Sequence, residues 1–107
     1  MANPWSGEVA ISVNGTERVM KLTLGALAEL EDRIEAGSLV DLISRFETGT
    51  YRSLDLMALI TAALRGGGLP ITETEVANAS FDGGLNRAAS AAARCMALAF
   101  APPESVE

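Results

Sequence analysis

Apolar and polar residues alternate near the start of the chain with the period of a β-strand. The segment EVAISV, residues 8–13, carries a larger apolar side chain at every second position, as a half-buried strand does. Asn14 and Gly15 follow it, and Asn-Gly between two extended runs signals a hairpin, because both central residues of a type I′ turn need positive φ. The pattern therefore predicts that residues 8–13 pair with residues 16–22.

The register of this hairpin determines which side chains face the core. A two-residue loop places Val9 opposite Met20, so Val9, Ile11 and Met20 share one face, whereas Ala10 and Val19 lie on the other. We expect the first face to meet the core, because it carries the larger apolar side chains.

After residue 22 the period of the apolar positions changes to about 3.6, which is typical of amphipathic helices. Capping boxes pair Ser38 with Asp41 and Thr72 with Glu75, and other caps and glycines supply further start and stop signals. The predicted helices span residues 24–36 (cap Thr23, end Gly37), a short helix from Ser38 to a stop at Gly49, residues 54–65 (cap Ser53), a short helix in residues 73–79, and residues 85–100 (cap Asp82).

Together these elements predict an α+β fold, in which an N-terminal β-hairpin is followed by a small bundle of four to five helices. A chain of 107 residues is long enough to bury one modest core. We expect a single domain over residues 1–101, with the hairpin at residues 8–22 and the helical part at residues 23–101. Residues 102–107 are expected to form a frayed tail.

Three consecutive glycines, residues 66–68, follow the third predicted helix and precede Pro70. A phosphate-binding loop instead joins a strand to the start of a helix, where N–H groups and the positive helix end face the anion. Here the order is reversed, and the carbonyl end of a helix carries partial negative charge. We predict that Gly66 ends the helix in the left-handed conformation, and that Gly67 and Gly68 tolerate alanine better.

The last predicted helix carries a stripe of mostly small residues, which we expect to pack in the core rather than to form an interface. Cys95 lies in this stripe and is the only cysteine, so we expect it to be a buried structural residue. The stripe comprises Leu85, Ala89, Ala92, Cys95, Met96, Ala99 and Phe100.

The charge of the chain argues against nucleic acid and membranes as partners. Fourteen acidic and eight basic residues give a net charge of -6, which repels phosphate backbones and anionic lipid surfaces. The longest apolar tract, residues 88–101, is interrupted by Arg94 and is shorter than the roughly 20 residues of a spanning helix. Because the N-terminus also lacks the features of a signal peptide, we expect a cytoplasmic protein.

No cluster of residues indicates catalysis or metal binding. The chain contains no histidine, so transition-metal sites and cysteine–histidine pairs lack their usual ligands. The carboxylates at residues 29–32 and 73–75 lie on surface turns of predicted helices, where solvated charge is the usual explanation. We predict no catalytic residue, no metal and no cofactor, and interpret the chain as a small acidic binding or assembly module.

The order of several segments is similar to that of one known family. The segments NPWSGEVAISVNG, LTLGALAELED, LVDLISRFETG and LRGGG, with an alanine-rich closing helix, resemble the gene transfer agent family of small phage-tail proteins. That family is related to tail assembly chaperones and is also labelled as phage tail tube proteins. The resemblance covers nearly the whole chain and transfers no catalytic residue. It implies a role in building a phage-like tail, with a gene between those of the major tail protein and the tape-measure protein.

The resemblance leaves two roles open. A tail assembly chaperone would bind tail proteins, such as the tape-measure or major tail protein, in the cytoplasm of a bacterial host, whereas a tube component would be incorporated into the particle. A tube subunit forms rings through a broad β-sheet, and this sequence predicts one hairpin and mostly helices, which favours the chaperone. A small acidic regulatory module that mimics nucleic acid is a third reading, but the charge is too mild and scattered to favour it.

A two-stranded hairpin presents unpaired N–H and C=O groups along its two edges. An extended segment of a tail protein, or a second copy in a homo-oligomer, could add there by strand pairing. The alternative is a monomer whose edges are protected by charged side chains such as Glu8 and Arg18. The predicted partner-binding residues on these edges are Ala10, Ser12, Glu17, Val19 and Lys21.

Overall fold

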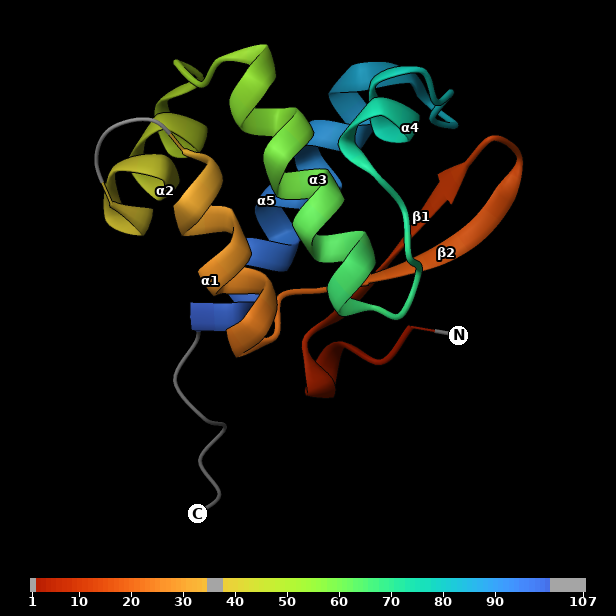
Figure 1. The fold of residues 1–107 in the computed structure, drawn as a ribbon, viewed down its shortest axis with the longest axis horizontal. Helices are drawn as coiled ribbons and strands as arrows, with labels where there is room; N and C mark the ends of the chain where they lie inside the picture. The colour runs from red at the N-terminus through yellow and green to blue at the C-terminus, as the bar shows by residue number, and fades with distance from the viewer. Residues whose placement is uncertain (1, 35–37, 101–107) are drawn as a thin grey trace.

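The computed structural model describes residues 2–34 and 38–100. A short 3₁₀ turn precedes the hairpin, and five helices follow it (Figure 1). The predicted α+β class is therefore confirmed. The elements are η1 (Pro4–Ser6), β1 (Glu8–Val13), β2 (Thr16–Lys21), α1 (Leu24–Arg33), α2 (Leu39–Thr48), α3 (Ser53–Gly66), α4 (Glu73–Ala77) and α5 (Gly84–Phe100).

The hairpin has the predicted turn and register. Asn14 and Gly15 both have positive φ, 53° and 84°, as a type I′ turn requires. Val9 pairs with Met20 across the two strands. Both are buried with Ile11, whereas Ala10 on the opposite face is exposed. The alternation of the sequence thus sets the face of the hairpin that meets the core.

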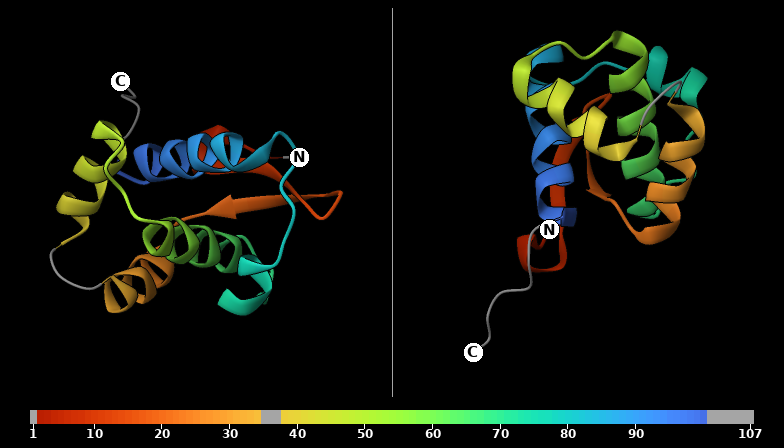
Figure 2. Two further views of the ribbon diagram at one scale, coloured as in Figure 1. Left: turned by 90° about the horizontal axis from the view of Figure 1, so that it is seen from above. Right: turned by 90° about the vertical axis from the view of Figure 1, so that its left-hand side faces the viewer.

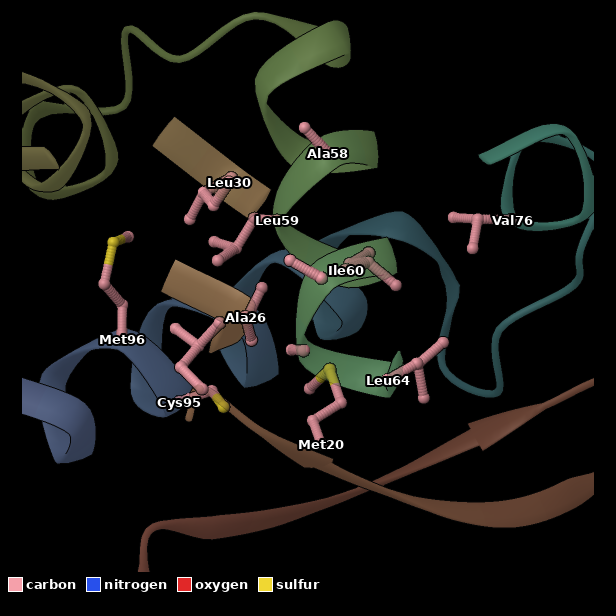
Figure 3. Packing of buried hydrophobic residues seen from close by; sticks show 14 of the residues in the cluster. Met20, Ala26, Leu30, Ala58, Leu59, Ile60, Leu64, Val76, Cys95 and Met96 are labelled. Carbon is pink, nitrogen blue, oxygen red and sulfur yellow. The ribbon is translucent and has the colours of Figure 1, made fainter. Parts of the chain in front are cut away.

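Helix α3 is the centre of the core. In the left view of Figure 2, β2 is seen between α5 and the pair α1 and α3. α5 contacts both strands, α3 contacts β2, and α3 and α5 also contact each other. Every residue from Ala58 to Leu64 is buried, so α3 packs on most of its circumference rather than along the single apolar stripe that we expected. Figure 3 shows Leu59 and Leu64 of α3 in one cluster with Met20 from β2 and Cys95 from α5.

The helix starts show which cap predictions hold. The capping boxes of Ser38 with Asp41 and of Thr72 with Glu75 are both formed, and Gly49 ends α2 in the left-handed region at φ 76°. The predicted cap of α3 at Ser53 is wrong. Ser53 is the first helical residue, and the N-cap is Arg52, whose N–H donates to the carboxylate of Asp55.

The ends of α1 and α5 differ from the expectation. α1 stops at Arg33 rather than at residue 36, because Ile34 is extended and is buried in the core. The predicted stop at Gly37 and the predicted tail at residues 102–107 lie outside the described residues. At the ends of the α5 stripe, Leu85 is 68% exposed and Phe100 is 47% exposed, since the helix extends past the elements that cover its middle.

The prediction that Gly66 takes a left-handed conformation is wrong. Gly66 is the last helical residue of α3, Gly67 follows at φ -83°, and the positive φ in this stretch belongs to Gly68, at 104°. The backbone turns two residues later than expected because the last turn of α3 continues until it meets β2. The N–H of Leu69 then donates to the carbonyl of Leu64, which closes the end of the helix.

Candidate partner-binding edge

The outer edge of β1 is closed by hydrogen bonds at its two ends. At the start, the N–H of Glu8 donates to the carbonyl of Asn3 over 3.0 Å. At the other end, the N–H of Asp82 donates to the carbonyl of Ser12 over 3.4 Å, and an isolated bridge joins Val13 to Phe81. These bonds also establish that Glu8 and Ser12 direct their backbone groups away from β2.

Between these two closures the edge is open at Ala10. Residues that alternate along a strand direct their N–H and C=O to the same side, so Ala10 faces outward like Glu8 and Ser12. No backbone hydrogen bond between described residues uses the N–H or C=O of Ala10, the N–H of Ser12 or the C=O of Glu8 for an outward partner. This stretch offers two donors and two acceptors to an added strand.

A hollow lies beside the open stretch, between β1 and the first half of α5. Its volume is about 400 Å³. Residues of the hairpin turn and of β1 surround it together with exposed Arg87 and partly buried Ala91 of α5. Three of the predicted binding residues, Ala10, Ser12 and Glu17, line it together. The full lining is Ala10, Ile11, Ser12, Gly15, Glu17, Asp82, Arg87 and Ala91.

The outer edge of β2 is different, because the end of α3 lies against it. A Cβ atom added to Gly67 would lie 2.0 Å from the carbonyl oxygen of Val19, and one added to Gly66 would lie 2.0 Å from that of Lys21. The two glycines therefore let the helix backbone occupy the space beside the strand. Val19 and Lys21 are both half-buried. The structure thus separates the predicted residues into Ala10, Ser12 and Glu17, which line one open hollow, and Val19 and Lys21, which lie next to the end of α3.

A charged cluster around the buried carboxylate of Asp55, which the sequence analysis missed, joins α2 to α3. Asp55 is 1% exposed, accepts from Nη2 of Arg52 over 3.1 Å and pairs with Nε of Arg45 at 3.5 Å. Burial by itself raises the pKa of this carboxyl, but the hydrogen bonds from Arg52 and the charges of Arg45 and Arg52 hold it below the usual 3.8. Arginine at an N-cap is not a standard signal, so the sequence pattern gave no indication of it.

Two other hollows differ in their lining. One is lined by charged side chains that pair with each other, and the other mainly by apolar side chains. Between α1 and α3, Arg65 donates to Glu29 over 3.1 Å, and Arg33 forms a two-bond pair with Glu73 at the start of α4. A separate apolar hollow of about 290 Å³ between α2 and α5 is lined mainly by Ile43, Phe46, Met96 and Phe100.

Cys95 is buried on the last helix, as the sequence predicted. It is fully buried in α5, and this burial raises the pKa of its thiol to about 11. Among the described residues there is no group of three or more acidic or cysteine side chains that could hold a metal ion. The same residues include no helix with the length and hydropathy needed to cross a membrane.

Comparison with protein families gives a match over most of the chain. The model of the family described as "phage tail tube protein, GTA-gp10" matches residues 6–102, a range that includes every element from β1 to α5. None of the curated proteins and none of the solved structures gives a significant match.

Proposed function

The chain belongs to the phage tail tube protein, GTA-gp10 family, and from this premise we propose that it is a non-enzymatic tail assembly chaperone. In this role it binds an extended segment of another tail protein, such as the tape-measure or major tail protein, along the open edge of β1. The observation that carries the proposal is the set of outward N–H and C=O groups at Ala10 and its neighbours, beside a hollow that can receive a strand.

Strand addition suits a chaperone because main-chain hydrogen bonds bind an extended segment without requiring one particular sequence. The closures at Asn3 and Asp82 limit the added strand to a short segment centred on Ala10. We place binding at Ala10, Ser12 and Glu17 rather than at Val19 and Lys21, because the end of α3 occupies the space beside Val19 and Lys21. Trp5, which is 81% exposed, belongs to the turn that is bonded to the start of β1 and adds an apolar anchor.

The alternative role is that of a tube component that remains in the particle, and the family description favours it directly. A tube ring requires a broad β-sheet, whereas the described residues form one two-stranded sheet. Mass spectrometry of purified particles distinguishes the roles. A chaperone is absent from the finished tail, and a tube component is present in stoichiometric amounts.

Co-expression with the tape-measure protein or the major tail protein of the same gene cluster tests the binding edge. Ala10→Pro removes an outward N–H and should fold, because an edge strand accepts proline where its N–H faces solvent. Ala10→Val is the matched control, since it adds side-chain volume and keeps the donor. We expect the wild type and Ala10→Val to retain a tail protein in a pull-down and Ala10→Pro to lose it.

A second variant shows whether lost binding comes from the missing hydrogen bond or from a local distortion caused by proline at residue 10. Ser12→Pro removes the other open donor and leaves the Ser12 carbonyl available to Asp82. Circular dichroism and thermal melting identify the folded variants. Retention of the same tail protein by folded Ala10→Pro and folded Ser12→Pro would contradict strand addition at β1.

A further inference from the structure

The open groups of β1 match a second copy of the same edge. Two copies related by a two-fold axis through Ala10 would place the strands antiparallel, with Ala10 opposite the second copy's Ala10 and Ser12 opposite its Glu8. Each open N–H then donates to an open C=O. The two Ala10 residues exchange two hydrogen bonds, and the N–H of each Ser12 donates to the C=O of the other copy's Glu8. The groups that this register leaves unused are the N–H of Glu8 and the C=O of Ser12, and both are already bonded within the chain.

We propose that the free protein forms a two-fold dimer by pairing β1 with β1, centred on Ala10. Other antiparallel registers satisfy fewer groups. Moving the second strand by two residues places Ala10 opposite Glu8 or Ser12, and half of the hydrogen bonds are lost because their donors or acceptors are already used by Asn3 and Asp82. The two closures therefore select one register.

The dimer cannot extend into a longer sheet. Pairing through β1 leaves β2 as the outer strand on each side, and there Gly66 and Gly67 bring the end of α3 against the carbonyls of Lys21 and Val19. An unprotected outer strand would template further addition. The two-fold pairing is isologous, and because α3 lies against each outer strand at Val19 and Lys21, it closes at two copies.

This inference rests on the proposed use of the same edge, and it adds a form of regulation. The dimer uses the hydrogen-bonding groups that a tail-protein segment requires, so dimerisation and partner binding exclude each other. A tail protein must displace the second copy, which keeps the edge covered until a partner is present.

Disulfide trapping tests the dimer directly. Directly opposite residues in a hydrogen-bonded antiparallel pair have Cα atoms about 5.5 Å apart, within the range that a disulfide spans. Ala10→Cys therefore places two thiols within bonding distance across the axis. Cys95 does not interfere, because it is buried. Glu17→Cys is the matched control, since residue 17 is exposed, lines the same hollow and lies on β2.

Under mild oxidation we expect Ala10→Cys to form a covalent dimer at least about tenfold faster than Glu17→Cys, as the proximity of the two thiols requires. Sedimentation of the wild type should show a monomer–dimer equilibrium without larger species, and folded Ala10→Pro should remain a monomer. Equal cross-linking of the two cysteine variants, or a wild type that stays monomeric at high concentration, would overturn the dimer.

The two proposals fail in different ways. If reduced Ala10→Cys binds the tape-measure protein but no cross-linked dimer forms, strand addition stands and the dimer is wrong. If the dimer forms and the oxidised, covalent dimer still binds that protein, the mutual exclusion is wrong. If the dimer forms and no tail protein is bound by any form, the dimer stands and the proposed function is wrong.

Discussion

The backbone of Gly67 lies so close to the carbonyl oxygen of Val19 that a Cβ atom on the glycine would be 2.0 Å from that oxygen. The same relationship joins Gly66 to Lys21. Neither glycine is needed for a positive φ, because Gly66 is helical and Gly67 has φ -83°. Their function in the fold is to let the end of α3 approach β2, which covers one edge of the hairpin and leaves the other edge open.

Alanine at either position should destabilise the protein. We expect Gly67→Ala and Gly66→Ala each to lower the free energy of unfolding by about 1 to 3 kcal/mol, the usual cost of overpacking, although alanine favours a helix. Our expectation that Gly67 tolerates alanine has no structural basis. Gly25→Ala in α1 is the control, because its nearest neighbour is 4.0 Å away, and it should stabilise by up to about 1 kcal/mol. Denaturant unfolding measures all three, and an unchanged midpoint for Gly67→Ala would contradict the close approach.

Asp55 should make stability depend on pH in the acid range. Its pKa is lowered in the folded protein from the usual 3.8, so its ion pairs contribute fully above that value and are lost as the pH falls through the lower folded pKa. We expect the wild type to lose stability below about pH 4. Asp55→Asn should be less stable at neutral pH and lose less on acidification. Parallel slopes for the two proteins between neutral and acid pH would argue against a charged Asp55.

Cys95 should react slowly in the native protein. Its thiol is buried, and the pKa of about 11 leaves little thiolate at neutral pH. We expect modification by a thiol reagent to follow local opening and to be at least about a hundredfold slower than in denaturant. Cys95→Ala should cost a modest packing loss without affecting partner binding. Labelling at the same rate in the native and unfolded states would show that the site is accessible.

Trp5 should report on occupation of the β1 edge. It is the only tryptophan in the chain, is 81% exposed and lies in the turn that Asn3 bonds to Glu8. We expect a solvent-exposed emission maximum that moves to shorter wavelength when the tape-measure protein binds, because binding would cover the indole. Binding of that protein without any change in emission or quenching would place the contact away from this turn.

Local signals in the sequence were sufficient to predict most of the fold. The Asn14-Gly15 turn set the register of the hairpin, and the Ser38 and Thr72 capping boxes set the starts of two helices, because each depends on residues within a few positions. What could not be predicted depends on distant parts of the chain. Gly67 lies against Val19, Asp82 is bonded to Ser12, and Arg45 pairs with Asp55, and no local pattern encodes any of these contacts.

The same distinction applies to the candidate site. Sequence alternation identified the outward residues of both strands, including Ala10 and Val19, but it treated the two edges as equivalent. The edges differ only because α3 ends at β2 and the segment before α5 returns to β1. Tertiary packing therefore decides which of the five predicted residues remain open to a partner.

Hydrogen exchange at the backbone amides of Ala10 and Ser12 tests most directly the claim that β1 is the partner-binding edge. The measurement compares the free chain, at a dilution where sedimentation shows a monomer, with its complex with the tape-measure protein. We predict that both amides exchange rapidly in the monomer and are strongly protected in the complex, while the amide of Ile11, which faces β2, changes little. A stable complex in which Ala10 and Ser12 exchange as rapidly as in the monomer would contradict the account.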